Sequence, residues 1–104
     1  MNNYYEITTS FLDPDNDSIQ IYMKRCDDRI ELSDDGYTLN FLRSHGFILS
    51  ENAKERIQDI ARQFGIQFKE NELIVYSDEN DFSEKKHMLI QAILRVSNLT
   101  YSHG

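Results

Sequence analysis

Three aspartates near the start of the chain, Asp13, Asp15 and Asp17, stand at every second position. Clustered carboxylates are the ligands that hard cations prefer, and this spacing matches the first, third and fifth positions of a calcium-binding loop. The same three carboxylates could instead form a tight turn, or a negatively charged surface for a partner. These readings predict different chemistry, so the residues that follow decide between them.

The rest of the segment does not complete a calcium loop. Ser18 stands at the sixth position, where such a loop has glycine, and Lys24 stands at the twelfth, where it has a bidentate glutamate. Pro14 fixes its own φ, and neighbouring aspartates and asparagine readily hydrogen-bond their own backbone. We therefore expect a hairpin loop whose carboxylates face water, and we expect no bound metal and no cofactor.

Acidic residues are concentrated in the first third of the chain. Residues 1–35 contain nine acids and three bases, a balance of −6, whereas residues 36–104 contain nine acids and eight bases, a balance of −1. Two further pairs, Asp27–Asp28 and Asp34–Asp35, belong to the acidic third. A chain this acidic is not expected to bind nucleic acid directly, but it can attract a basic protein. The plain alternative is a solvated face that keeps the protein soluble.

One combination of residues would permit metal-dependent catalysis. Asp34, Asp35 and His87 could hold a cation between them if the fold brings them together. For His87 alone, a structural hydrogen bond on a helix is the simpler interpretation. The sequence shows no nucleophile–base pair and no glycine-rich phosphate loop, so we do not expect an enzyme.

Length and composition predict one globular domain over residues 1–104. The chain is 39% hydrophobic and holds a single cysteine, Cys26, which fits a reducing cytoplasm. We see no signal peptide, and no apolar run is long enough to span a membrane. The expected location is therefore the cytoplasm, while the oligomeric state is left open.

Alternation and helical spacing predict an α+β fold. Five segments have strand character: residues 5–11, 19–24, 30–33, 66–68 and 73–76. Three segments have helical character, with caps at Thr38, Ser50 and Asp81 and ends near Gly46, Gly65 and Asn98. The order β-β-β-α-α-β-β-α predicts a mainly antiparallel sheet with the helices packed on one face. Gly36, at the end of the third strand, is expected to take a positive φ.

Four short pieces of the sequence resemble a family of bacterial and phage domains of unknown function, numbered 1828. The pieces are Thr9–Asp13 with Asn16–Asp17, then Ile19–Tyr22, then Leu32–Thr38, and finally Asp81–Phe82 with Lys86–Leu94 and Val96. The likeness extends over about residues 5–101. It implies a prokaryotic or phage origin but no agreed activity, so it assigns no catalytic residue.

These observations favour a small acidic binding protein over an enzyme. The hypothesis is an inhibitor of a nucleic-acid-acting host defence enzyme, such as a CRISPR nuclease, whose Lys- and Arg-rich channel it would occupy. The carboxylates expected to imitate phosphates are those of Asp13, Asp15, Asp17, Asp27, Asp28, Asp34 and Asp35. Reversing the first three to lysine is expected to abolish binding with little change in stability. The alternatives are an accessory module of a toxin or restriction system, or the metal-dependent enzyme described above.

Overall fold

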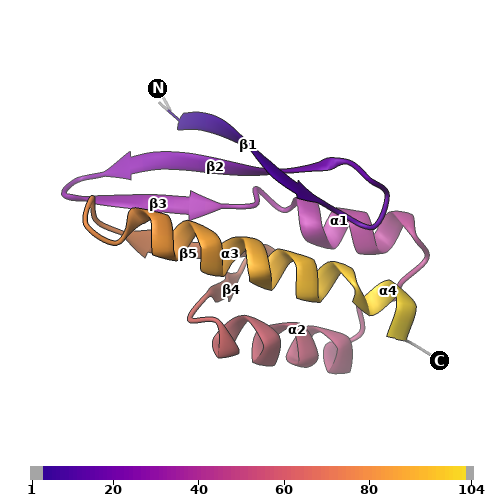
Figure 1. Ribbon diagram of the computed structural model, residues 1–104. Coiled ribbons are helices and arrows are strands. Elements are labelled where there is room, and N and C mark those ends of the chain that lie inside the picture. Colours follow the sequence, from indigo (N-terminus) through magenta and orange to yellow (C-terminus); the bar gives the residue numbers. More distant parts are fainter. Residues whose placement is uncertain (1–3, 103–104) are drawn as a thin grey trace.

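The computed structural model describes residues 4–102, and Figure 1 shows how their helices and strands are arranged. The strands are β1 (Tyr4–Leu12), β2 (Ser18–Cys26), β3 (Arg29–Ser33), β4 (Gln67–Lys69) and β5 (Glu72–Ser77). The helices are α1 (Tyr37–Ser44), α2 (Glu51–Gln63), α3 (Phe82–Ser97) and the short α4 (Leu99–Ser102), which the sequence pattern did not predict. No helix within residues 4–102 is long and apolar enough to cross a membrane.

The strands form one antiparallel sheet in the order β1-β2-β3-β5-β4. Alternate residues of β2, β3 and β5 join residues of α1, α2 and α3 in a single hydrophobic core, which places these helices on the same face of the sheet (Figure 1). The predicted α+β fold is therefore confirmed. Within the described residues the opposite face carries no helix. This helix-free face includes Glu6, Thr8, Gln20, Tyr22, Lys24, Arg29, Glu31, Ser33 and Tyr76.

The orientation of β2 follows from its apolar residues. Ile19 and Ile21 are only 1% and 0% exposed, because they lie in the core beneath the helices. Burying one such side chain stabilises the fold by roughly 1.5–3 kcal/mol, so turning the strand over would be very unfavourable. Gln20 and Tyr22 alternate with these isoleucines and therefore lie on the helix-free face.

One of the predicted caps is confirmed and another is wrong. The Ser50 hydroxyl accepts a hydrogen bond from the Ala53 amide at 3.1 Å and caps α2. Asp81 does precede α3, but its carboxylate makes no capping bond. It accepts instead from the Asp78 amide at 3.0 Å, so the side chain orders the preceding loop rather than the helix.

The start of α1 also differs from the prediction. Thr38 is not the cap, because α1 begins at Tyr37 and Thr38 is buried in its first turn. The amide of Thr38 donates instead to the Asp34 carboxylate at 3.0 Å. Gly36 precedes the helix with a φ of 79°, in the left-handed region, as predicted.

The edge strand β1 is the most exposed part of the sheet. In the described part of the chain it pairs only with β2, and its register shifts between Thr8 and Leu12. At this irregularity the Thr9 hydroxyl donates to the Ile19 carbonyl at 2.8 Å. Of the six large hydrophobic side chains exposed in the described residues, four belong to this strand: Tyr4, Tyr5, Phe11 and Leu12.

Candidate functional site

Asp13, the first of the three alternating aspartates, is a buried structural residue with 3% exposure. Its Oδ1 atom accepts hydrogen bonds from the amides of Asp15 and Asp17 at 2.8 and 3.0 Å. Its Oδ2 atom accepts from the Tyr37 hydroxyl at 2.5 Å. The predicted turn is confirmed, but the expectation that its carboxylates face water is wrong for Asp13. One carboxylate closes the loop and binds it to α1.

A second contact holds the same loop against α1. Asp15 Oδ2 lies 2.9 Å from His45 Nε2, which is at the C-terminal end of that helix. Tyr37, Phe41 and His45 follow one another at four-residue spacing, and their rings contact in turn at centroid distances of 6.3 and 4.3 Å. Because Asp13 and Asp15 both make contacts that hold the loop, reversing all three aspartates cannot be expected to leave stability unchanged.

Asp34 is also structural, with 1% exposure. Its Oδ1 atom accepts from the amides of Gly36 and Leu73 at 2.9 and 3.1 Å, and its Oδ2 atom accepts from the Thr38 amide at 3.0 Å. The residue thus joins the end of β3 to β5 and to the first turn of α1. Burial raises the pKa of Asp34, and the three amide hydrogen bonds act in the opposite direction. Asp34 and Asp13 are both buried and their carboxylates accept internal hydrogen bonds, which argues against the predicted contact of these two residues with a partner.

Asp17 and Asp35 remain exposed at this end of the molecule. Neither carboxylate forms an ion pair with any Lys, Arg or His of residues 4–102. Glu6 of β1 is exposed and unpaired in the same way, and it lies opposite Tyr22 in the ladder between β1 and β2. Within residues 4–102 these three carboxylates therefore have no counter-ion, Asp17 and Asp35 near the end of the molecule and Glu6 beside Tyr22.

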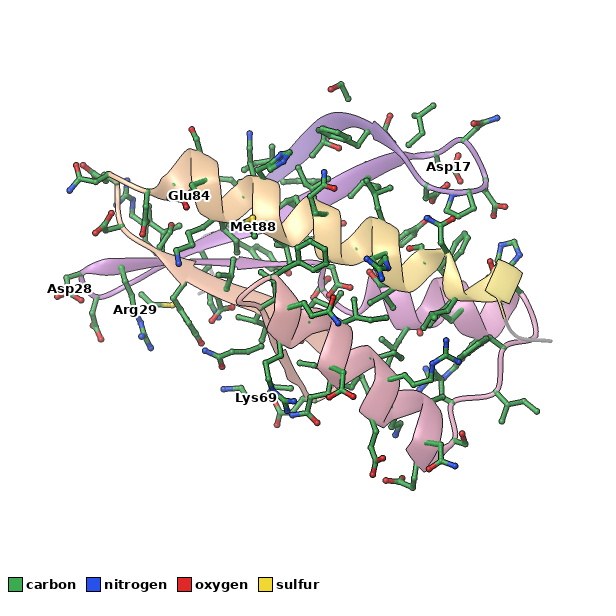
Figure 2. All side chains as sticks on the ribbon, turned by 60° about the horizontal axis from the view of Figure 1, so that its bottom comes forward. Asp17, Asp28, Arg29, Lys69, Glu84 and Met88 are labelled. Carbon is green, nitrogen blue, oxygen red and sulfur yellow. The ribbon has the colours of Figure 1, made fainter. Side chains whose placement is uncertain are left out.

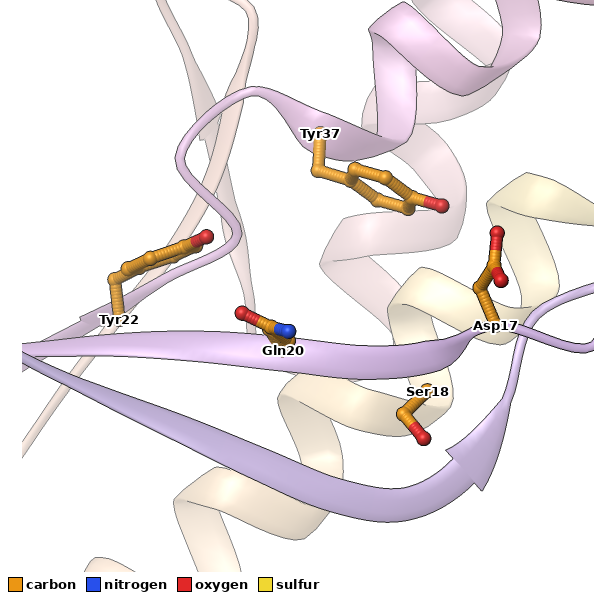
Figure 3. Close-up of a pocket in the computed structure, with 5 residues that line it drawn as sticks. All are labelled: Asp17, Ser18, Gln20, Tyr22 and Tyr37. Atoms are coloured by element: carbon orange, nitrogen blue, oxygen red, sulfur yellow. The ribbon is translucent and has the colours of Figure 1, made fainter.

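A hollow of about 370 Å³ lies beside these carboxylates (Figure 3). Strand β2 supplies Ser18, Gln20 and Tyr22, α1 supplies Tyr37, and the loop before β2 supplies Asp17. Figure 3 shows the two tyrosine rings on either side of the Gln20 amide, with the Asp17 carboxylate near the tip of Tyr37. The site thus combines aromatic faces, an amide and a carboxylate.

The carboxylates act electrostatically on both rings. Burial raises the pKa of Tyr22, and the negative charges of Glu6 and Asp35 raise it further. Burial also raises the pKa of Tyr37, together with the hydrogen bond that its hydroxyl donates to Asp13. Both hydroxyls therefore stay protonated at neutral pH, and the potential in the hollow favours positive charge.

Asp27 and Asp28 lie elsewhere. They form the turn between β2 and β3, at the far end of β2 from Asp17. The nine residues of β2 lie between the two acidic groups and alone span about 26 Å from first to last, at the usual rise of a strand. Figure 2 shows Asp17 and Asp28 at opposite ends of the molecule. The seven predicted partner contacts therefore do not form one surface.

The metal-dependent alternative finds no support in the geometry. Residues 4–102 contain no group of three or more His, Cys, Asp and Glu side chains placed to hold a metal ion, so Asp34, Asp35 and His87 do not form one. His87 does not make the predicted structural hydrogen bond to any of residues 4–102. Its ring packs edge-on to Phe11 of β1, with the centroids 6.3 Å apart.

The sequence interpretation missed Tyr22, Tyr37 and Gln20. It placed Tyr22 and Gln20 only within the strand predicted at residues 19–24, although a tyrosine that alternates with buried isoleucines was a signal for a binding face. Tyr37 could not be assigned, because its role depends on the loop at Asp13, which is 24 residues away in the chain. Three of the pieces that carry the family resemblance meet at this hollow.

The fold and the site define a small α+β domain whose one uncovered sheet face ends in an acidic, tyrosine-lined hollow. Residues 9–96 match the family model described as "Domain of unknown function DUF1828". The match spans most of the chain, so the protein belongs to this family. No curated protein and no solved structure matches it.

Proposed function

We propose that this protein is a non-enzymatic binding protein that engages a Lys- and Arg-rich surface of a protein partner. The observation that carries the proposal is the accessible, unpaired negative charge of Asp17, Asp35 and Glu6 beside the hollow. Carboxylates without internal counter-ions attract a basic surface and steer its approach.

The partner class we favour is a nucleic-acid-acting host defence enzyme, such as a CRISPR nuclease. Such an enzyme has a basic channel for its nucleic acid, and carboxylates can compete for the same Lys and Arg side chains. The protein would then be an inhibitor of phage or bacterial origin that acts in the cytoplasm. The free Cys26 thiol fits a reducing compartment.

Two double variants test which acidic end is used. Asp17→Asn with Asp35→Asn removes two charges beside the hollow, while Asp27→Asn with Asp28→Asn removes two charges at the opposite end. The variants are matched, because they have the same net charge and each changes one residue with positive φ, at 55° for Asp35 and 57° for Asp27. Asparagine tolerates that backbone conformation.

The measurement is recovery of a CRISPR nuclease by the tagged protein from nuclease-treated bacterial lysate at low and at high salt. We expect the wild type and the Asp27/Asp28 variant to recover it at low salt only, because screening weakens exposed charge interactions. The Asp17/Asp35 variant should lose most of this recovery. Equal binding by all three proteins would exclude the hollow end, and no basic partner for the wild type would refute the proposal.

A further inference from the structure

We infer that the hollow receives the guanidinium group of a partner's arginine, which stacks on the tyrosine rings while the carboxylates neutralise its charge. The inference rests on the proposed function, because it names the group through which a basic partner would be held. It concerns only the site formed by Asp17, Ser18, Gln20, Tyr22 and Tyr37.

The helix-free face already contains one arginine that stacks on a tyrosine ring beside a carboxylate. The Arg29 guanidinium carbon lies 3.9 Å from the centroid of the Tyr76 ring. The Tyr76 hydroxyl donates to Glu31 Oε1 at 3.2 Å, so arginine, tyrosine and carboxylate adjoin one another. Stacking of a guanidinium on tyrosine is favourable, more so when the ring is partly shielded from water. This sheet surface therefore supports the geometry that we assign to the hollow.

The hollow holds the same components without the arginine. Tyr22 and Tyr37 supply ring faces, and Asp17 supplies a carboxylate that pairs with no base of residues 4–102. No Lys or Arg is among the residues that line it. A guanidinium group from a partner would complete the same combination of arginine, tyrosine and carboxylate.

The remaining polar groups in the hollow also have no hydrogen-bond partner among the described residues. The side chains of Ser18 and Gln20 and the hydroxyl of Tyr22 make no hydrogen bond to another described residue. A guanidinium has five N–H donors in one plane, so it can donate to the Gln20 amide oxygen and the Asp17 carboxylate while its face contacts a ring. An ammonium group lacks a planar face to stack, so arginine fits this lining better than lysine.

The test uses three blocked peptides, Ala-Arg-Ala, Ala-Lys-Ala and Ala-citrulline-Ala, titrated into the full chain and followed by NMR. Citrulline keeps the planar shape of arginine but has no charge. We expect Ala-Arg-Ala to shift the Gln20 side-chain amide and the Tyr22 ring signals with millimolar affinity. It should bind at least roughly fivefold more tightly than either other peptide.

Variants of Tyr22 distinguish the contribution of its ring to peptide binding from an effect on folding. Tyr22→Phe keeps a ring face and should bind within about twofold of the wild type, whereas Tyr22→Ala should weaken binding roughly 3- to 30-fold. Tyr76→Ala removes the ring that Arg29 already occupies and should leave the titration unchanged. Circular dichroism of each variant establishes that it is folded.

Several outcomes would overturn the inference. Shifts centred on Asp28, equal binding of the lysine and arginine peptides, or full binding by a folded Tyr22→Ala protein would each do so. If the peptide fails but the Asp17/Asp35 variant still loses its nuclease partner, the proposed function stands and only the arginine assignment falls. If the peptide binds at the hollow but no nuclease is recovered, the site stands and the proposed partner falls.

Discussion

Asp13 and Asp17 stand four positions apart in one loop, yet their carboxylates have different roles. Asp13 accepts two amide hydrogen bonds and one from the Tyr37 hydroxyl, while the Asp17 side chain is exposed and accepts none from the described residues. The sequence shows two aspartates of equal chemistry. Two amides of the loop itself and the Tyr37 hydroxyl of α1 separate the structural residue from the one that is free to bind.

We expect Asp13→Ala to lower the free energy of unfolding by roughly 1–3 kcal/mol, because two loop amides and a partly buried hydroxyl lose their acceptor. Urea denaturation measures this change. Asp17→Ala is the control from the same loop and should stay within about 0.5 kcal/mol of the wild type. Equal effects of the two substitutions would contradict the assignment of Asp13 as the structural residue.

The Tyr37 hydroxyl makes stability depend on pH in the alkaline range. Its pKa is raised above the ordinary 10.0 by burial, by its hydrogen bond to Asp13 and by nearby carboxylates. Below pH 10.0 both the folded and the unfolded chain hold this proton, so the full stability is present. Above it the unfolded chain releases the proton first, and stability falls as pH rises toward the folded value.

We therefore expect the urea midpoint of the wild type to decrease more steeply above pH 10 than that of Tyr37→Phe, which has no phenol to titrate. Absorbance of the ionised phenols should also show one late-titrating tyrosine fewer in the variant than in the wild type. Parallel pH profiles of the two proteins would show that Tyr37 does not titrate as assigned.

At the scale of elements, the junction of β3, β5 and α1 depends on Asp34. We expect Asp34→Ala to lower the free energy of unfolding by roughly 2–4 kcal/mol, because three amides lose a buried acceptor at once. Hydrogen exchange should become faster at the amides of Gly36, Thr38 and Leu73. The exposed neighbour provides the control, since Asp35→Asn should change stability by less than about 0.5 kcal/mol. Unchanged exchange at these amides would rule out the bridging role.

The elements that sequence patterns predicted well are those fixed by local contacts. Alternation predicted the strand at residues 19–24, in which Ile19 and Ile21 are buried, and Ser50 caps α2 through a residue only three positions away. The start of α1 was wrong because the Thr38 amide donates to Asp34, and the same carboxylate also binds the Leu73 amide, 39 residues away. No periodicity in the sequence reports a contact of that span, and the hollow depends on contacts of the same kind.

At the scale of the whole molecule, the aspartate groups of the acidic first third lie at the two ends of an elongated shape. The principal extents are 43 × 27 × 26 Å, and Asp17 and Asp28 stand at opposite ends in Figure 2. Along the helix-free face between them, Lys24 lies 3.8 Å from Glu31 and partly neutralises it. A basic partner would therefore contact one end rather than the length of the sheet, which composition alone could not reveal.

The exposure of β1 has a consequence for the solubility of the protein. Glu6 is the single charged residue of this nine-residue edge strand, which otherwise presents tyrosines, hydroxyl side chains and apolar groups. A long edge strand without charge or proline offers its free amides and carbonyls to other chains and can template fibril growth. We therefore expect Glu6 to oppose aggregation through this edge, in addition to placing a charge beside the hollow. A related protein that lacks this carboxylate would need another residue to prevent pairing at this edge, such as a lysine or a proline elsewhere in β1.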